Sequence, residues 1–543
     1  MPLRKTSIYK YLEPDYRYKE KYWPILTDFV KKKYGDSEIT SLVAVQETLK
    51  ECFSILCKEF IVVLKKEKRA SFFIFVQDLH EDSIDMWRAQ LNGDKFPINQ
   101  EDFAATRRIM KYILEQGCGL DLIGHDFFFK EINEQIEPYT KHLEELVYIG
   151  TWAFTISEYI ARSQICNHSV SLKVENNEFV INVKPPFNSL FSFIFADNQR
   201  HNKAVVVSNS IIELKKILND DLKTNYDYLC GAVFGQLQDK KFRFSIFKLD
   251  ELIKELIKKH GYSKDVVEIF YSGLMVNKNN VLSIEDCILK TQDSRRYMYR
   301  PILEYTIDEK TFWIIGANKW SESLTALTTN CIPFGQFPDE WKQLIPICDF
   351  CNRIMNTHDV VLEEPAIEII KNVNFKFDRN IKSLKKTNNQ GVSIIKKNVG
   401  EIDLVFIDEK NKLIYVAECK HNKSRFEYNN WKRDISNFRS KYESQLSNKF
   451  NWISNNKLPL LEHFEILYAC KIESQENYNV IPLFIINAPT LYMYDSEYLV
   501  VTLHDLELLL SGKHVTHEFN GEINGKKVNI KKPYLQNAEK LFI

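Results

Sequence analysis

The spacing of hydrophobic residues changes along the chain and divides it into three regions. In the first region, residues 1–165, apolar side chains recur at intervals of three or four, for example at Leu42, Val45 and Leu49. This is the period of an α-helix that buries one face. The pattern predicts a mostly helical region.

Residues 166–342 show a different pattern, in which short apolar runs alternate with turn-forming residues. Residues 169–174 and 179–183 flank the polar segment Glu175-Asn176-Asn177-Glu178, which is typical of a β-hairpin. Further strands are expected at 204–207, 298–307 and 311–315, and helices at 210–219 and 249–259. The second region is therefore expected to be a mixed α/β domain.

Residues 343–543 again combine helical and strand patterns and are expected to form a third domain. The expected helices cover 360–373, 428–453 and 503–510. The expected strands cover 391–395, 402–407, 413–419, 464–470 and 480–486. The whole chain is thus predicted to be a multidomain α/β protein.

Composition limits where a nucleic-acid or membrane partner can be sought. Lys plus Arg and Asp plus Glu each number 73, so the net charge is zero and an affinity for nucleic acid would have to be local. No run reaches the roughly 18 consecutive apolar residues of a membrane span, and the N-terminus lacks the apolar core of a signal peptide. The 11 cysteines have no regular spacing, which suits reduced thiols. We expect a soluble, cytoplasmic protein without a membrane partner.

The most informative segment runs from Gly400 to Lys420 and consists of two apolar strands joined by a short polar loop. Asp403, Glu418 and Lys420 lie within these strands. Burying ionised groups without partners costs several kcal/mol each. The three side chains therefore need one another, a metal ion, or both.

Strand geometry predicts that these three groups converge. If the loop covers 409–412, the register places Asp403 directly opposite Glu418, and directly opposed residues share a face. Lys420 is two residues from Glu418 and points to the same side. Two repelling carboxylates would be relieved by a hard divalent cation, and their oxygen donors suit Mg²⁺ or Mn²⁺ better than zinc.

Asp403, followed after fourteen residues by Glu418-Cys419-Lys420, resembles the D-x(n)-[D/E]-x-K core of the PD-(D/E)xK nuclease superfamily. The preceding Gly400-Glu401-Ile402 is similar to a strand opening that is frequent in these nucleases. The predicted order of elements also resembles the αβββαβ core of their restriction-endonuclease-like fold. The resemblance covers about 180 residues at the C-terminal end and says nothing about residues 1–342.

The resemblance implies a role for each matched residue. Asp403 and Glu418 would bind Mg²⁺ or Mn²⁺, with the backbone carbonyl of Cys419 as a third ligand. Lys420 would position and activate the attacking water. The side chain of Cys419 is expected to alternate away from the site into the core.

Two further site residues are expected by resemblance on the flanking helices. Many relatives add a metal-binding carboxylate from the helix before the strands. We favour Glu364 over Glu363 and Glu368, because Glu364 precedes Ile367 and Ile370 by three and six residues. Many relatives also carry a glutamine on the helix after the motif. Gln445 is its match here and joins Asp403, Glu418 and Lys420 as a catalytic candidate.

Local charge supports a phosphate-bearing partner. Residues 371–450 contain 18 Lys or Arg against 9 Asp or Glu, in a chain that is neutral overall. Tyr428 and Trp431 lie among them and are candidates for stacking on bases. Basic residues around an acidic metal site suit a phosphodiester substrate. The predicted nucleic-acid contacts are Lys423, Arg425, Lys432, Arg433 and Lys449.

The expected function is a metal-dependent nuclease, with DNA favoured over RNA on family grounds and with bacterial defence against phage or foreign DNA as a role by analogy. Residues 1–342 would then select the substrate, gate activity, form a homo-oligomer or bind a partner protein. Three alternatives stay open. The protein is an inactive nucleic-acid-binding or regulatory relative, an RNA-cleaving effector, or a chain in which Asp403 and Lys420 merely form a buried ion pair.

A second candidate metal site lies earlier in the chain. Cys348 and Cys351 have the spacing of half a zinc site, which Cys331 and His358 are suitably placed to complete. The overall spacing fits no standard zinc finger, and an apolar helix start explains the two cysteines equally well.

Overall fold

The computed structural model describes residues 3–6, 8–14, 17–124, 128–166, 169–183, 194, 210–237, 243–247, 249–357, 360–386, 391–394, 399–473, 477–494, 496–513, 517–523 and 526–532. It is a mixed α/β structure with several sheets, as the sequence predicts. The chain forms two compact units. The N-terminal unit comprises Met1–Ile160, Leu172–Ile181 and Ser208–Met355, and the C-terminal unit comprises Ala161–Ser171, Asn182–Val207 and Asn356–Ile543. Among the described residues, no helix has the length and apolar character needed to cross a membrane.

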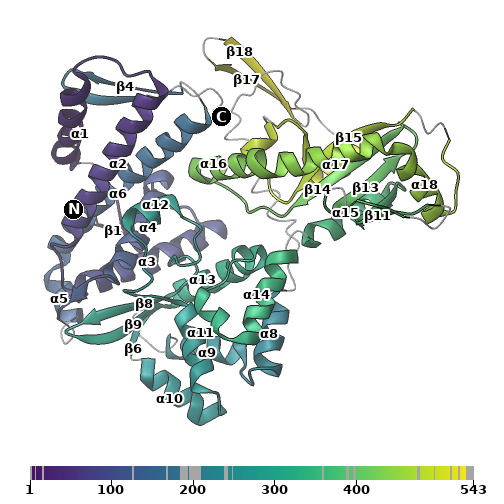
Figure 1. The fold of residues 1–543 in the computed structure, drawn as a ribbon. Helices are drawn as coiled ribbons and strands as arrows, with labels where there is room; N and C mark the ends of the chain where they lie inside the picture. The colour runs from purple at the N-terminus through teal and green to yellow at the C-terminus, as the bar shows by residue number, and fades with distance from the viewer. Residues whose placement is uncertain are drawn as a thin grey trace. The chain divides into compact units, whose positions relative to one another are not determined.

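The first part of the chain is mostly helical, as expected (Figure 1). After a short pair of strands, β1 (Leu3–Lys5) and β2 (Lys10–Leu12), helices dominate up to residue 165. The helix that begins at Gln100 is capped by Asn99, whose side chain accepts hydrogen bonds from the backbone N–H groups of Glu101 and Asp102. The helices are α1 (Lys19–Tyr34), α2 (Leu42–Leu64), α3 (Ala70–Leu91), α4 (Gln100–Gly117), α5 (Phe128–Glu134) and α6 (Ile136–Ile165).

The predicted hairpin is present as β4 (Val170–Glu175) and β5 (Glu178–Val183). Its turn residues Asn176 and Asn177 have positive φ angles of 51° and 60°, which asparagine tolerates better than most residues. The predicted strand at 204–207 lies outside the described residues. The strands predicted at 298–307 and 311–315 correspond to β8 (Ile302–Ile307) and β9 (Lys310–Gly316), which pair antiparallel.

A five-stranded sheet joins the first and middle regions of the chain within the N-terminal unit. Its order is β3–β8–β9–β6, with β7 also paired to β8. Because β3 comes from the first region and pairs with β8 of the middle region, these regions share one unit where the sequence predicts two domains. The remaining strands are β3 (Asp121–Leu122), β6 (Phe244–Phe247) and β7 (Met275–Val276). The helices are α8 (Ser210–Asp220), α9 (Tyr226–Leu237), α10 (Leu249–His260), α11 (Lys264–Gly273), α12 (Ile284–Leu289), α13 (Ala317–Asn330) and α14 (Ile345–Thr357).

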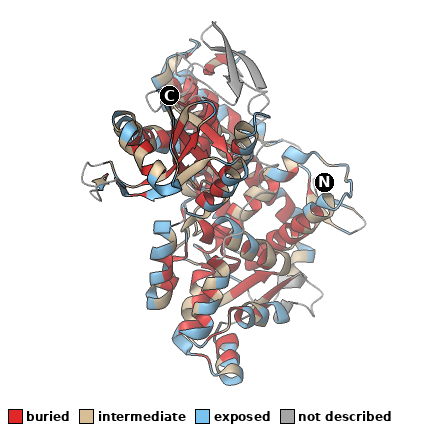
Figure 2. Cartoon of the chain, turned by 90° about the vertical axis from the view of Figure 1, so that its right-hand side faces the viewer, coloured by how far each residue is buried: buried red, intermediate tan, exposed pale blue. Residues whose placement is uncertain are grey.

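The C-terminal unit is built on a second five-stranded sheet, in the order β10–β13–β14–β15–β16. Strand β13 is antiparallel to both of its neighbours, β10 and β14, whereas β14, β15 and β16 are parallel. The central strands β13 and β14 are largely buried, whereas the edge strand β10 is mostly not; buried segments are red in Figure 2. The strands are β10 (Lys376–Ile381), β13 (Ile402–Asp408), β14 (Leu413–Lys420), β15 (Asn479–Ile486) and β16 (Leu499–Thr502).

Helices cover both faces of this sheet. One face packs α15 (Val360–Asn372) and α19 (Leu503–Leu510) against alternate strand residues such as Leu404 and Cys419. The other face packs α16 (Tyr428–Asn437), α17 (Glu443–Asn455) and α18 (Lys457–Tyr468) against Val405 and Val416. A π-helical turn, Phe438–Tyr442, joins α16 to α17. A separate hairpin, β17 (His517–Ile523) and β18 (Lys526–Lys532), follows.

One strand prediction in this unit is wrong, and another is confirmed only in part. The predicted strand at 464–470 is the end of α18, whose buried Leu460, Leu461 and Phe464 have helical spacing; a short apolar run does not by itself distinguish strand from helix. The segment predicted at 391–395 contains only β12 (Val392–Ser393), which pairs with β11 (Ser383–Leu384) outside the main sheet. The edge of the main sheet is β10 instead, and its sequence KFDRNI is too polar to stand out as a strand.

Candidate active site

The hairpin of β13 and β14 has the register that the sequence predicts. Asp408 pairs with Leu413 and Leu404 with Ala417, so the next position along places Asp403 opposite Glu418. Asp403 is two residues from Val405, and Glu418 is two residues from Val416, so both carboxylates lie on the face covered by α16 and α17. Cys419 points to the opposite face and is buried in its core, as expected.

Asp403, Glu418 and Lys420 come together in the structure. The Lys420 ammonium lies 2.9 Å from Oε1 of Glu418, and the backbone N–H of Cys419 donates to Oδ2 of Asp403 at 3.0 Å. The Glu418 side chain is 5% exposed and that of Lys420 is 14% exposed. The ammonium of Lys420 also lies 5.0 Å from the centre of the Tyr442 ring. The hairpin thus holds two carboxylates and a lysine in a largely buried position.

A second lysine, Lys449 of α17, completes this group. Its ammonium lies 3.1 Å from Oδ1 of Asp403 and also pairs with Oε2 of Glu418. Leu446 and Ile453, three residues before and four after, are buried on the same helix face, so packing of α17 on the sheet carries Lys449 into the site. We call Asp403, Glu418, Lys420 and Lys449 the carboxylate–lysine cluster.

Two lysines accompany the two carboxylates of the cluster. Burial raises the pKa of the Asp403 carboxyl, and the neighbouring Glu418 carboxylate raises it further. Lys449, Lys420 and the backbone N–H of Cys419 act in the opposite direction. Two buried carboxylates this close are stable as anions only when cations accompany them, and the two lysines meet that need here.

Lys449 was predicted from the sequence as a surface contact for nucleic acid, and the structure places it in the cluster with only 6% of its side chain exposed. The sequence does contain the signal. Lys449 lies at helical spacing from the apolar Leu446 and Ile453, which marks the buried face of the helix. Gln445 is one turn earlier on α17 and is partly buried.

Glu364, the predicted helix-borne metal ligand, is not brought to the cluster. Its side chain is 59% exposed and pairs with Arg379 of β10. The preceding residue, Glu363, is buried instead. Adjacent residues of a helix point in different directions, so Glu364 faces outward while Glu363 faces the core. Within the described part of the chain, no group of three His, Cys, Asp or Glu side chains is arranged to hold a metal ion.

The predicted nucleic-acid contacts divide into buried and exposed residues. Lys423 and Arg425 are 5% and 9% exposed, and Arg425 pairs with the buried Asp434 at 3.2 Å. Lys432 and Arg433 are exposed on α16. Trp431, a predicted stacking residue, is fully buried in the core beneath them.

The cysteines of the possible zinc site belong to the N-terminal unit. Cys331 and Cys351 are buried in its hydrophobic core, and the Cys331 thiol donates to the backbone carbonyl of Gln336 at 3.1 Å. Cys348 is partly exposed. His358 lies outside the described residues.

Replacing Lys449 by methionine is expected to destabilise the metal-free protein, because the two buried carboxylates would then face each other with less compensation. Removing one partner from a buried ion pair typically costs about 3–5 kcal/mol. Millimolar Mg²⁺ should restore much of this loss and bind more tightly than in the wild type, since the competing ammonium is gone. Thermal unfolding with and without Mg²⁺ measures both effects.

The control is Lys441→Met, which removes an exposed lysine just before the same helix. It should leave both the unfolding temperature and the Mg²⁺ response unchanged. A Lys449→Met protein that matches the wild type in both measurements would show that Lys449 does not neutralise the carboxylates.

The donor set of the cluster fits a hard divalent cation. Asp403 and Glu418 supply carboxylate oxygens from adjacent strands, the ligand type that Mg²⁺ and Mn²⁺ prefer. No family model, no curated protein and no solved structure matches this chain. What the protein does is therefore inferred from the cluster and the fold that positions it.

Proposed function

We propose that the protein is a metal-dependent nuclease that hydrolyses phosphodiester bonds, with DNA favoured over RNA. The observation that carries this proposal is the convergence of Asp403, Glu418 and Lys420 on one face of the β13–β14 hairpin. Carboxylates that bind a divalent ion beside a lysine suit hydrolysis at a phosphate. The convergence matches the arrangement that the resemblance to PD-(D/E)xK nucleases implies.

The order of elements around the hairpin supports a restriction-endonuclease-like domain. Helix α15 is followed by β10, by the small β11–β12 pair outside the main sheet, by β13 and β14, then by α16, α17 and α18, and then by β15. Apart from that extra pair and the division of the helical segment into three helices, the order is that of the αβββαβ core. Strands β10, β13, β14 and β15 are neighbours in one sheet in that order. The proposal therefore assigns the nuclease activity to the C-terminal unit.

In this mechanism Asp403 and Glu418 would hold Mg²⁺ or Mn²⁺, with the carbonyl of Cys419 as a further ligand. A bound ion would lower the pKa of a coordinated water and neutralise charge on the phosphate. The Cys419 N–H holds Asp403 in place through its hydrogen bond to Oδ2. Lys420, held by its ion pair with Glu418, would donate hydrogen bonds to the attacking water or to a phosphate oxygen.

An inactive nucleic-acid-binding relative is the second candidate, and Lys449 favours it. The Lys449 ammonium pairs with both carboxylates and so supplies positive charge where a metal ion would. If that pairing is permanent, the cluster is a structural element. The two candidates differ in whether a divalent ion displaces Lys449.

Cleavage assays on plasmid DNA, single-stranded DNA and RNA, with Mg²⁺, Mn²⁺ or EDTA, test the proposal. We expect cleavage of DNA that requires either ion and stops in EDTA. Binding without cleavage under every condition would support the inactive relative. Cleavage of RNA alone would identify an RNA-directed effector.

The N-terminal unit would select the substrate, gate cleavage, or mediate assembly with a second copy or a partner protein. A role in bacterial defence against phage or foreign DNA is an analogy with other multidomain nucleases. It rests on no residue of this chain.

Binding of duplex DNA is expected to depend on salt partly through Lys432 and Arg433, which are exposed on α16. Each phosphate neutralised by a protein cation contributes about 0.9 to the slope of log K against log salt. Replacing both residues by alanine should reduce the slope by up to about two. Fluorescence anisotropy over a salt series measures it.

The matched control replaces Lys258 and Lys259, an equally adjacent and exposed pair on α10 of the N-terminal unit. Its slope should equal that of the wild type. If only the control pair lowers the slope, the DNA contacts lie on the N-terminal unit.

A further inference from the structure

Helix α4 carries three charged residues at intervals of four, Arg107, Lys111 and Glu115, and among the described residues the middle one has no ion-pair partner. Arg107 pairs with Glu322 of α13 at 3.1 Å, and Glu115 pairs with Arg296 at 2.8 Å. The partly buried Lys111 makes no hydrogen bond or ion pair with any residue that the structure describes. A desolvated ammonium without a partner is unfavourable, so Lys111 needs an explanation.

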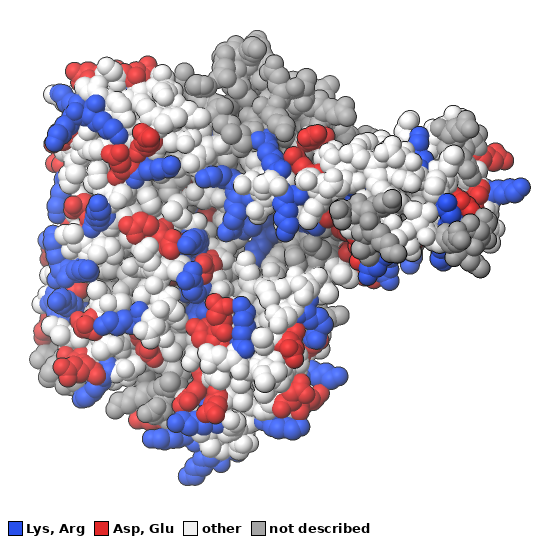
Figure 3. All heavy atoms as spheres, in the orientation of Figure 1, with Lys and Arg blue, Asp and Glu red and all other residues white. Residues whose placement is uncertain are grey.

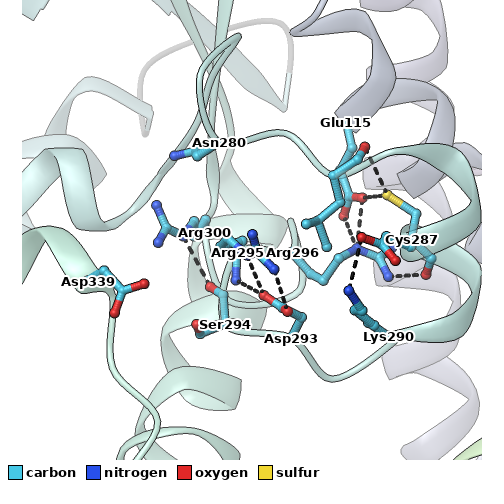
Figure 4. Close-up of polar contacts among 12 residues, drawn as sticks. Glu115, Asn280, Cys287, Lys290, Asp293, Ser294, Arg295, Arg296, Arg300 and Asp339 are labelled. Carbon is cyan, nitrogen blue, oxygen red and sulfur yellow. Dashed lines mark hydrogen bonds and ion pairs between the residues drawn. The ribbon is translucent and has the colours of Figure 1, made fainter.

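The carboxylate next to Lys111 along the helix is fully engaged elsewhere. Figure 4 shows Glu115 turned toward Arg296 and Cys287. It accepts hydrogen bonds from Nε of Arg296 at 2.8 Å, from the backbone N–H of Tyr297 at 2.7 Å and from the thiol of Cys287 at 3.1 Å. Glu115 therefore serves to hold the loop before β8 and does not neutralise Lys111.

The two nearby carboxylates of the α3–α13 contact are engaged as well. Glu81 accepts from the backbone N–H groups of Asn318 and Lys319, at 2.7 and 3.1 Å, and so caps α13. Burial raises the pKa of Glu81 to about 8, so this group adds little negative charge at neutral pH. Glu322 pairs with the ammonium of Lys319 at 2.6 Å in addition to Arg107.

The result is an excess of buried positive charge. Lys111 lies within electrostatic range of three other cations, Lys319, Arg107 and Arg296, and only Glu322 opposes them strongly. Burial, with the repulsion from these cations, lowers the pKa of Lys111 to about 7. Burial also lowers the pKa of Arg107. These groups would be stabilised by an anion.

Buried polar atoms without partners lie on the same two helices. His80 of α3 is fully buried, and neither of its ring nitrogens has a hydrogen-bond partner. On α4, the hydroxyl of Thr106 and Nε of Arg107 are likewise buried and unpaired. Buried polar groups are normally satisfied by protein, water or ligand, and of these residues His80 and Arg107 lie within electrostatic range of Lys111.

We propose that Arg107, Lys111 and Lys319 form a binding site for a phosphate-class oxyanion in the N-terminal unit. A phosphate group carries about 1.5–2 negative charges at neutral pH and several acceptor oxygens, which matches the local excess of cations. On the face shown in Figure 3, the acidic and basic residues of the N-terminal unit are interspersed. The preference for an anion comes from the three cations themselves, of which Arg107 and Lys319 share the carboxylate of Glu322. This site is independent of the nuclease proposed for the C-terminal unit.

Phosphate binding to the full-length protein tests the site directly. Isothermal titration with inorganic phosphate at pH 7, with chloride at equal ionic strength as the reference, should show one site per chain. Phosphate at about 100 times its dissociation constant should raise the unfolding midpoint of the N-terminal unit by about 5 °C. Lys111→Met should weaken phosphate binding at least tenfold and remove this shift, while unfolding in chloride stays level or moves to higher temperature.

The control is Lys254→Met, which removes an exposed lysine of α10 in the same unit and should bind phosphate like the wild type. Lys111→Gln provides the same readout if the methionine variant fails to fold. Titration with adenosine 5′-monophosphate distinguishes a nucleotide from free phosphate, since tighter binding identifies a phosphoryl group on a nucleotide. A wild type that binds neither compound, or a Lys111 variant that binds phosphate equally well, would overturn the proposal.

Discussion

Replacing Glu418 by glutamine is expected to abolish cleavage while the C-terminal unit stays folded. Glutamine keeps the shape of the side chain, but its neutral amide binds a divalent ion far more weakly than a carboxylate does. Lys449 keeps Asp403 as a partner at 3.1 Å in this variant, so the lysine is not left alone in the core. The same reasoning applies to Asp403→Asn, in which Glu418 remains paired with both lysines.

Single-turnover cleavage in Mg²⁺ measures the loss, and circular dichroism establishes that the variants are folded. We expect a rate reduction of at least about 10³-fold for each, comparable to the loss of a group that stabilises transition-state charge. Glu368→Gln is the matched control, because Glu368 is an exposed glutamate of α15 on the other face of the sheet. Near wild-type cleavage by Glu418→Gln would show that the carboxylates have a structural role only.

Lys420→Ala is expected to reduce cleavage by about 10²–10⁴-fold, the range for a positioned group that assists proton transfer. Affinity for the metal should stay the same or increase, because a positive charge next to Glu418 is lost. This combination separates Lys420 from the two carboxylates, whose replacement should weaken metal binding and cleavage together. Calorimetric titration of Mg²⁺ beside single-turnover cleavage measures both quantities.

Lys410→Ala tests whether any lysine of the hairpin would have the same effect. Lys410 is exposed in the loop between β13 and β14, at the far end of the same two strands. The Lys410→Ala variant should cleave DNA at the wild-type rate. If Lys420→Ala does so too, Lys420 is only an ion-pair partner of Glu418, and the motif has been misassigned.

The two lysines of the cluster are expected to respond in opposite ways. Loss of Lys420 should impair chemistry and spare stability, since Glu418 keeps its pairing with Lys449. Loss of Lys449 should impair metal-free stability and favour metal binding. A protein in which both replacements only lower stability would be the inactive relative.

The hairpin was predictable from sequence because its geometry is local. Side chains alternate along a strand with a period of two, and the polar loop sets the register. Those two facts place Asp403 opposite Glu418 and Lys420 on the same face. The helical character of the first region, residues 1–165, was predictable for the same reason, since a period of 3.6 is visible in adjacent turns.

Other features depend on polar sequences that carry no periodic signal. Strand β10 contains three charged residues among six, and it becomes a strand because β13 offers an unpaired edge. The end of α18 was mistaken for a strand because a short, mostly apolar segment fits both structures. Each depends on a neighbour that the local pattern does not identify.

By itself, the sequence determined the helical N-terminal region, the β13–β14 register and the three residues that resemble a nuclease motif, because each is set by neighbours along the chain. Tertiary structure alone decided that Lys449, 31 residues from Glu418, joins both carboxylates. It also decided that Glu364 turns outward and that β3 unites the first two regions in one sheet. The physical reason is the same throughout: these contacts depend on how helices and strands distant in sequence pack together, and packing is a property of the whole fold.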